Sequence, residues 1–111
     1  QSQRAIAVIS EKKGLSYLNK FAVTEQAQGE GLGSAIWYHL KKDHPKLFWR
    51  SRIRNSINNW YFKIADGCYK TENWVVFWSG FENYDEIKSC IDLAMSEKID
   101  LSDENTDTLL I

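Results

Sequence analysis

The amino-acid sequence predicts an α/β (α+β) fold in which helices flank a central mixed sheet. Three observations predict it. Short apolar runs typical of buried strands alternate with runs of helical periodicity. A glycine-rich turn at 28–33 joins a strand-like run to a helix-like run. The resulting element order, β-β-α-β-α-β-α, is typical of a sheet that packs against helices.

The first elements are expected to be a β-hairpin. Residues 4–10 enclose the apolar run Ala-Ile-Ala-Val-Ile and predict a buried strand. Residues 11–14 end in glycine and predict a tight turn, and residues 15–23 predict the second strand.

A helix is expected next, over residues 34–42. Leu32, Ile36 and Leu40 recur every four residues and form one apolar stripe. Pro45 ends this segment, because proline cannot continue a helix.

The second half of the chain predicts two further strands with a short helix between them. Residues 46–52 and 72–80 are rich in aromatic and β-branched side chains, as strands are. Residues 58–65 predict the helix, and Asp66-Gly67 is interpreted as its stop and a turn.

Asn83 is expected to cap a last helix, with Glu86 completing a capping box. The apolar side chains on its core face would be Ile87, Cys90, Ile91 and Ala94. Residues 1–100 are therefore predicted to form one domain, and the acidic, polar residues 101–111 a C-terminal tail.

Composition excludes several classes of function. The net charge of −1 gives no global attraction to nucleic acid or to a membrane surface. No apolar run approaches the roughly 20 residues that a membrane-spanning helix requires. The two cysteines, Cys68 and Cys90, lie far apart, and only two histidines accompany them, so no metal site is expected. Unpaired cysteines suit a reducing, intracellular compartment.

The glycine-rich turn predicts an anion site. Glycines let backbone amides approach a phosphate closely, and the N-terminus of the following helix adds partial positive charge. The glycine spacing excludes both the dinucleotide fingerprint and the P-loop, and fits Gln-x-x-Gly-x-Gly instead. A plain left-handed turn before a helix is the alternative. The candidate cofactor-binding residues are Gln28, Gly29, Glu30, Gly31, Leu32 and Gly33.

A second candidate site lies at Arg50 and Arg52. Side chains alternate along a strand, so both guanidinium groups point to one face. Two such groups beside apolar residues suit a substrate with two carboxylates, because guanidinium binds carboxylate bidentately. The structural alternative is a pair of surface or salt-bridged arginines with no role in binding. Nucleic-acid binding is the other, and the acidic overall balance argues against it.

Six motifs together resemble the C-terminal acetyltransferase domain of N-acetylglutamate synthase, a GNAT-type domain. The same domain occurs in bifunctional bacterial synthase–kinases and in fungal acetylglutamate kinases. The six motifs lie, in order, at residues 18–23, 28–33, 49–52, 55–62, 66–67 and 77–80. The sequence departs from the family at Asn19, where many members have Asp, and at Ser56 and Asn59, where some have Pro. The resemblance also implies further elements before the first strand seen here.

The resemblance implies acetyl transfer from acetyl-coenzyme A to the α-amine of L-glutamate, in arginine biosynthesis. Direct attack in a ternary complex is expected, and no metal. The loop at 28–33 would bind the pyrophosphate, as GNAT pyrophosphate loops do. Backbone groups of Phe21, Ala22 and Val23 would bind the pantetheine arm and the thioester oxygen.

The acceptor is expected to be held through its carboxylates. Arg50 and Arg52 would bind them, assisted by Lys20 and Asn55, and Lys20 is also a catalytic candidate. Tyr61 is the candidate general acid for the leaving thiolate. Lys20 could instead extend from a strand to solvent, and Tyr61 could be a core aromatic. No side chain is an obvious general base.

The same resemblance implies an amino-acid kinase-like domain in the full-length protein, a homo-oligomer, and a cytoplasmic or mitochondrial-matrix location. Two other functions stay open. One is a regulatory or assembly domain of an acetylglutamate kinase, and the other is a GNAT enzyme with a different acceptor.

Overall fold

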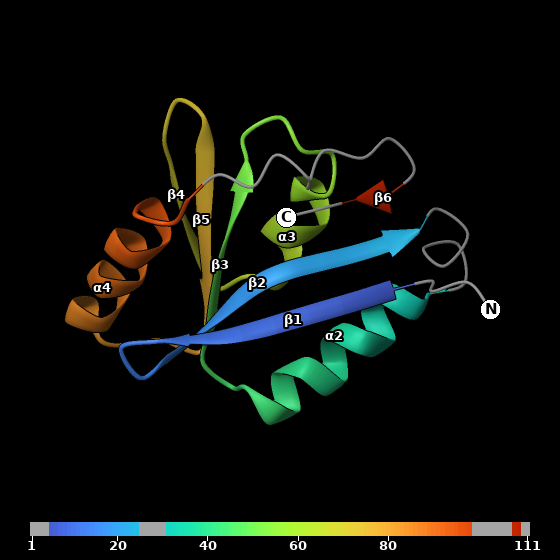
Figure 1. Ribbon diagram of the computed structural model, residues 1–111, viewed down its shortest axis with the longest axis horizontal. Helices are drawn as coiled ribbons and strands as arrows, with labels where there is room; N and C mark the ends of the chain where they lie inside the picture. The colour runs from blue at the N-terminus through green and yellow to red at the C-terminus, as the bar shows by residue number, and fades with distance from the viewer. Residues whose placement is uncertain (1–4, 25–30, 99–107, 110–111) are drawn as a thin grey trace.

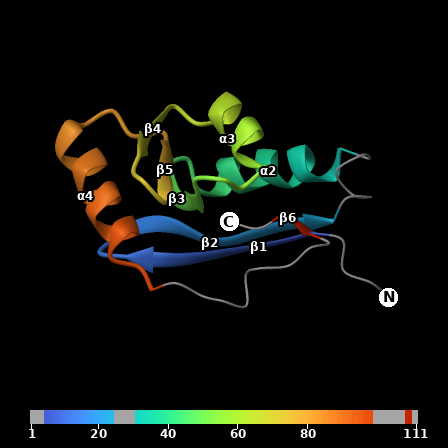
Figure 2. The same ribbon diagram turned by 90° about the horizontal axis from the view of Figure 1, so that it is seen from above.

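A computed structural model of the chain describes residues 5–24, 31–98 and 108–109. Its sheet runs in the order β1-β2-β3-β5-β4, with β6 paired to β2 (Figure 1). Figure 2 shows α2 and α3 on one side of this sheet. The predicted α/β class is therefore confirmed, with parallel and antiparallel pairs in one sheet.

β1 (Ala5–Lys12) and β2 (Leu15–Thr24) form the predicted hairpin. Two residues connect them, Lys13 with φ 52° and Gly14 with φ 81°. Two successive positive φ values match the two-residue turn that suits the twist of antiparallel strands.

A β-bulge at Asn19 changes the face that β2 presents. Val8 pairs with Lys20 and Ile9 pairs with Leu18, so Asn19 is the extra residue. Leu18 and Phe21 consequently face the same hydrophobic cluster, although three positions separate them. Alternation beyond the bulge places Lys20 on the opposite face from Phe21.

The sheet divides between β2 and β3 (Leu47–Arg52). These strands are parallel and pair only at Ser16 with Leu47 and Tyr17 with Phe48. β3 instead pairs along its whole length with β5 (Trp74–Ser79). Beyond Tyr17 the two parallel strands separate (Figure 1).

The three predicted helices are present as α2 (Leu32–Asp43), α3 (Asn58–Ile64) and α4 (Tyr84–Met95). α2 and α3 cover one face of the sheet, where Trp37 and Tyr61 join the larger hydrophobic cluster. α4 covers part of the other face with the buried side chains Cys90 and Ala94.

The N-cap of α4 is confirmed, and its capping box is not. Asn83 Oδ1 accepts hydrogen bonds from the backbone N–H groups of Asp85 and Glu86, at 2.8 and 3.2 Å. The Glu86 carboxylate instead binds Lys46 Nζ at 3.1 Å. The Glu86 side chain, which a capping box would use, therefore forms an ion pair with Lys46 instead.

β4 (Gly67–Lys70) was not predicted from the sequence. The Asp66-Gly67 pair does follow α3, but Gly67 begins a strand that pairs antiparallel with β5. The strand is four residues long and mostly exposed at the sheet edge, so it shows no alternating apolar pattern. A Cβ at Gly67 would lie 2.7 Å from the Trp78 ring, and this contact requires glycine.

β6 (Thr108–Leu109) lies within the predicted tail. It pairs antiparallel with the end of β2, Val23 opposite Leu109 and Thr24 opposite Thr108. The predicted domain boundary at 100/101 lies outside the described residues.

Candidate active site

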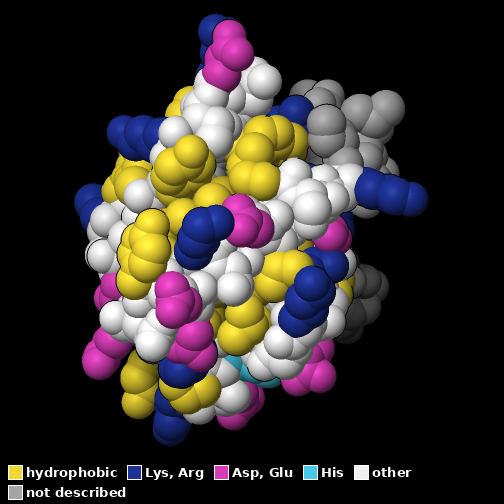
Figure 3. All heavy atoms as spheres, turned by 90° about the vertical axis from the view of Figure 1, so that its left-hand side faces the viewer, with side chains coloured by type: hydrophobic (Ala, Val, Ile, Leu, Met, Phe, Trp, Pro, Cys, Tyr) yellow, Lys and Arg dark blue, Asp and Glu magenta, His cyan; other side chains and the backbone are white. Residues whose placement is uncertain are grey.

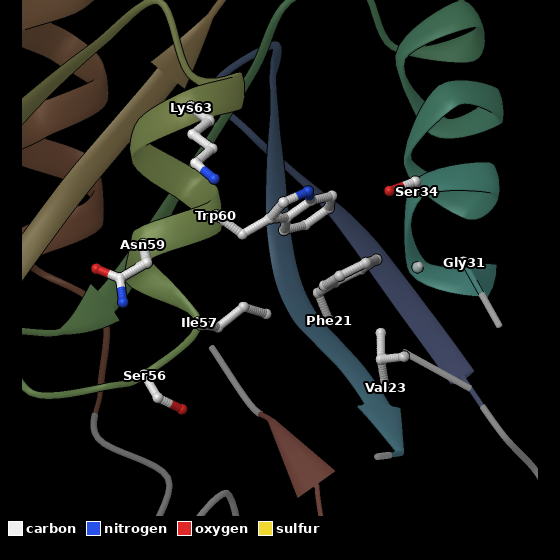
Figure 4. Close-up of a pocket in the computed structure, with 10 residues that line it drawn as sticks. Phe21, Val23, Gly31, Ser34, Ser56, Ile57, Asn59, Trp60 and Lys63 are labelled. Carbon is white, nitrogen blue, oxygen red and sulfur yellow. The ribbon is translucent and has the colours of Figure 1, made fainter. Parts of the chain in front are cut away.

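A pocket of about 340 Å³ opens where β2 and β3 separate (Figure 4). Phe21 and Val23 line it from β2, and Trp60 lines it from α3. Neither the β3 ladder nor the β6 ladder includes residues 18–22 of β2. The pocket therefore lies beside a stretch of strand backbone that these two ladders leave uncovered. The other lining residues are Gly31, Gly33, Ser34, Ser56, Ile57, Asn59 and Lys63.

The N-terminus of α2 forms one wall of this pocket. Gly31 is the N-cap residue, with φ 77°, and the first turn has no acidic side chain. Glycine carries no side chain that could cap the first amide groups, so they suit an anionic ligand. Gly33 and Ser34 also line this wall, and a Cβ at Gly33 would lie 3.5 Å from Val23, an ordinary contact. Leu32 packs against the core instead.

Gly31 and Gly33 of the predicted loop are therefore at the pocket, while Gln28, Gly29 and Glu30 lie outside the described residues.

The pocket combines an apolar wall with one cationic side chain. The rings of Phe21 and Trp60 stack with centroids 5.7 Å apart and an interplanar angle of 15°. Lys63 lies on α3, and Figure 4 shows its side chain beside that of Trp60. An apolar surface next to a helix N-terminus and a lysine fits a ligand with an apolar arm and a phosphate group.

The paired arginines lie on the opposite face of the sheet, on the side of α4. The Arg50 guanidinium carbon lies 3.8 Å from the Trp74 ring centroid, and that of Arg52 lies 5.0 Å away. One indole contacts both groups, so the two side chains share a face, as strand alternation predicts.

Arg50 is also bound to the C-terminal end of α4. Its Nη1 donates to the carbonyl oxygens of Ala94 and Glu97, at 3.1 and 3.0 Å. Its Nη2 donates to the carbonyl oxygen of Lys98 at 3.2 Å. The side chain is only 7% exposed. A cation at the negative end of a helix dipole is favourable, so Arg50 joins β3 to α4.

The other two predicted acceptor residues lie on β2 and in the loop that follows β3. Lys20 is half-buried on β2, on the arginine face by strand alternation. Asn55 lies in the β3–α3 loop, and its side-chain oxygen accepts from Ile57 N–H at 3.2 Å. The buried Asn58 donates to Arg52 O at 2.8 Å and holds this loop against the end of β3.

Tyr61 lies in the core of the α2–α3 face and is fully buried. Its ring contacts Trp49 and Phe77, with centroids 5.3 and 5.2 Å away. Its hydroxyl has no hydrogen-bond partner among the described residues. Burial raises the pKa of Tyr61 well above its usual value, which keeps the phenol protonated.

Two of the six sequence motifs position strands. The Asp66 carboxylate accepts from Gly80 N–H at 2.7 Å. Gly80 has φ 87°, and a Cβ there would collide with the carbonyl oxygen of Pro45. These residues fix β4 and β5 against the α2–β3 connection.

Charge on the α4 side is mixed. Figure 3 shows acidic and basic side chains interspersed across this face. Lys46 pairs with Glu86, and Lys88 pairs with Asp92 at 3.3 Å. Such a face offers no single-sign patch for nucleic acid.

Comparison with protein families supplies the deciding observation. Residues 1–97 match the family model described as NAT, the N-acetyltransferase of N-acetylglutamate synthase. The chain belongs to this family. The predicted resemblance is thus confirmed, and the chain is an N-acetyltransferase domain.

Relatives of the NAT domain carry two kinds of name. An "Acetylglutamate kinase" of Xanthomonas campestris is 44% identical over 96 residues, which are 82% of this chain and 22% of the relative. The mitochondrial N-acetylglutamate synthase of Danio rerio is 41% identical over 95 residues, 83% of this chain and 18% of the relative. The human enzyme of that name is 48% identical over 67 residues, 60% of this chain and 12% of the relative. The chain thus spans about a fifth or less of these relatives.

Within the part of the NAT domain that the structure describes, no group of His, Cys, Asp and Glu side chains is arranged to hold a metal ion. The helices described there also lack the length and hydropathy that crossing a membrane requires.

Sequence reasoning did not include Trp74, beside the arginines, or six of the residues that line the pocket: Ser34, Ser56, Ile57, Asn59, Trp60 and Lys63. The strand pairing that brings Trp74 to the arginines is long-range, and the pattern of a single strand does not contain it. Lys63 follows the Trp-Tyr-Phe motif on α3, and helical spacing from Trp60 could have indicated that both share a face.

Proposed function

We propose that this NAT domain transfers the acetyl group of acetyl-coenzyme A to the α-amine of L-glutamate. The observation that carries the proposal is the division of the sheet between β2 and β3. A pocket suited to the donor opens on one face, and the paired arginines lie on the other.

The donor would bind along the pocket. Its pyrophosphate would lie at the N-terminus of α2, beside Gly31 and Gly33, with the Lys63 ammonium group nearby. Its pantetheine arm would lie against Phe21 and Trp60. The uncovered backbone of β2 supplies amide groups for this arm and for the thioester oxygen.

The acceptor would bind on the arginine face. Arg52 and Lys20 would bind the glutamate carboxylates, with Asn55 at the loop end of the site. Arg50 would contribute its positive charge without binding a carboxylate directly. Three of its N–H groups already donate to carbonyl oxygens at the α4 end.

The chemistry is a direct attack of the neutral amine on the thioester carbonyl. The new N–C bond forms, the C–S bond breaks, and the thiolate takes a proton from Tyr61. The tyrosine recovers its proton from the ammonium group of the intermediate through water. The Tyr61 phenol is protonated at neutral pH, as a general acid must be, and burial, which raises its pKa, makes it a weaker proton donor than a tyrosine in water.

A regulatory or assembly domain of an acetylglutamate kinase is the second candidate. The relative named "Acetylglutamate kinase" favours it. Retention of Lys20, Arg52, Asn55 and Tyr61 favours catalysis, since a decayed site would have lost some of them. In either case we propose a kinase-like neighbouring domain, a homo-oligomer, and a cytoplasmic or mitochondrial-matrix location.

A thiol-release assay tests the proposal. Free coenzyme A is measured with acetyl-coenzyme A and glutamate, aspartate, glutamine or no acceptor. Release that depends on glutamate supports the synthase reaction. Release with another amino acid alone would indicate a different acceptor. Donor binding by calorimetry without any release would support the regulatory role.

A further inference from the structure

Trp74 lies between the two arginines that define the acceptor face. It is the first residue of β5 and pairs directly with Arg52 in the antiparallel β3–β5 ladder. Arg50 is the diagonal neighbour, and its guanidinium carbon is 3.8 Å from the indole centroid. Directly opposed and diagonal side chains on one face of a sheet are close enough to interact.

Packing against the hydrophobic clusters does not explain the position of the Trp74 indole. Trp74 is half-buried and belongs to neither of the two hydrophobic clusters of the described residues, whereas Trp78 on the same strand packs against one of them. The ring contacts recorded for Trp74 are with the two guanidinium groups. The face of a tryptophan ring attracts such a cation through the ring quadrupole.

The backbone that carries Trp74 is fixed. Its N–H donates to Thr71 Oγ1 at 3.0 Å, and its carbonyl oxygen accepts from Thr71 N–H at 2.7 Å. The carbonyl oxygen of the preceding Asn73 accepts from Ile53 N–H at 2.9 Å. The indole is thus presented to the arginines from a turn that is hydrogen-bonded on both sides.

We infer that Trp74 is a positioning residue of the acceptor site, which orders Arg52 for a substrate carboxylate while Arg50 is anchored to α4. This inference rests on the proposed function, because it concerns how the same acceptor is recognised. An arginine ordered before binding loses less side-chain entropy when a carboxylate arrives. The contribution should therefore appear in acceptor affinity and leave donor affinity unchanged.

The test is steady-state kinetics on the 111-residue chain and its variants Trp74→Leu, Trp74→Phe and Trp78→Leu. Trp74→Leu removes the aromatic face and keeps apolar bulk, whereas Trp74→Phe keeps a weaker aromatic face. Trp78→Leu is the matched control, since it lies on the same strand and face. Thermal unfolding of each variant confirms that it is folded.

For Trp74→Leu we expect the KM for glutamate to rise about tenfold, with the KM for acetyl-coenzyme A within about twofold of the wild-type value. Trp74→Phe should recover part of the loss, and Trp78→Leu should leave the ratio of the two KM values unchanged. Combining Trp74→Leu with Arg52→Ala should cost less than the product of the two single effects, because both act through one group.

The inference is overturned if Trp74→Leu leaves the glutamate KM unchanged, if it raises both KM values equally, or if Trp78→Leu has the same selective effect. The inference is also overturned if the double variant raises the glutamate KM by the full product of the Trp74→Leu and Arg52→Ala effects. Those results can arise while the wild-type chain acetylates glutamate, so they leave the proposed function intact. A wild-type chain that binds acetyl-coenzyme A and never uses glutamate overturns both.

Discussion

At the scale of single residues, a substitution at Tyr61 can distinguish a structural role from a catalytic one. Its buried hydroxyl lacks a hydrogen-bond partner among the described residues, and such a group destabilises a fold. We expect Tyr61→Phe to raise the free energy of unfolding by about 1 kcal/mol. If the phenol is the general acid, the same variant lowers kcat about 100-fold. Denaturant unfolding and the thiol-release assay measure the two effects, with the exposed Tyr84→Phe as control.

A more stable and fully active Tyr61→Phe would assign Tyr61 to the core alone. The combination expected here, higher stability with lower activity, is the signature of a residue kept for function.

The pH dependence of stability follows from the same burial. The pKa of Tyr61 is raised in the folded state, so its contribution to stability is complete below the unfolded pKa of about 10 and is lost as pH rises above it. Burial likewise raises the pKa of Cys90 to about 12. We expect the stability advantage of Tyr61→Phe over wild type to grow between about pH 9 and 11. Urea denaturation across this range measures it, and a constant difference would contradict the assignment.

At the scale of elements, Arg50 connects β3 to α4. Three hydrogen bonds to the carbonyl oxygens of the α4 end and the stack on Trp74 depend on this one guanidinium. We expect Arg50→Ala to lower the free energy of unfolding by about 2–3 kcal/mol and to raise the glutamate KM as well. Arg54→Ala, at an exposed position nearby, is the control. If Arg50→Ala raised the glutamate KM and left stability unchanged, Arg50 would bind the substrate and would not stabilise the packing of α4.

Elements with strong local patterns could be predicted from the sequence, and those set by long-range pairing could not. The Lys13-Gly14 turn, the four-residue spacing in α2 and the Asn83 cap each carry their own signal. β4 carries none, because its strand assignment comes from pairing with β5. The bulge at Asn19 is visible only in the register with β1, yet it decides which face Lys20 occupies.

At the scale of the whole molecule, the site depends on where the sheet divides. The motifs predicted which segments would take part in the proposed site, including the turn around Gly31 and the strand that carries Arg50 and Arg52. They did not predict that pairing between β2 and β3 stops at Tyr17, because strand separation is a property of the assembled sheet. Nor did they predict the anchoring of Arg50 by α4, which joins residues more than 40 positions apart.

The division of the sheet also predicts that donor and acceptor binding can be weakened separately. Lys63 lines the pocket beside α2, and Arg52 lies on the α4 side of β3. We expect Lys63→Gln to raise the KM for acetyl-coenzyme A about fivefold, less at high salt, because a charge contact is screened. Arg52→Ala should raise only the glutamate KM, by at least about tenfold.

The double variant Lys63→Gln with Arg52→Ala should then show the product of the two single effects on kcat/KM, to within about 0.5 kcal/mol. Initial rates over a grid of both substrates measure this, and Lys88→Gln on the exposed surface of α4 serves as the charge control. Strong non-additivity, or a rise in both KM values from either single change, would place the two side chains in one shared pocket. Additivity supports two binding surfaces that meet only at the gap between β2 and β3, where the acetyl group would pass from donor to acceptor.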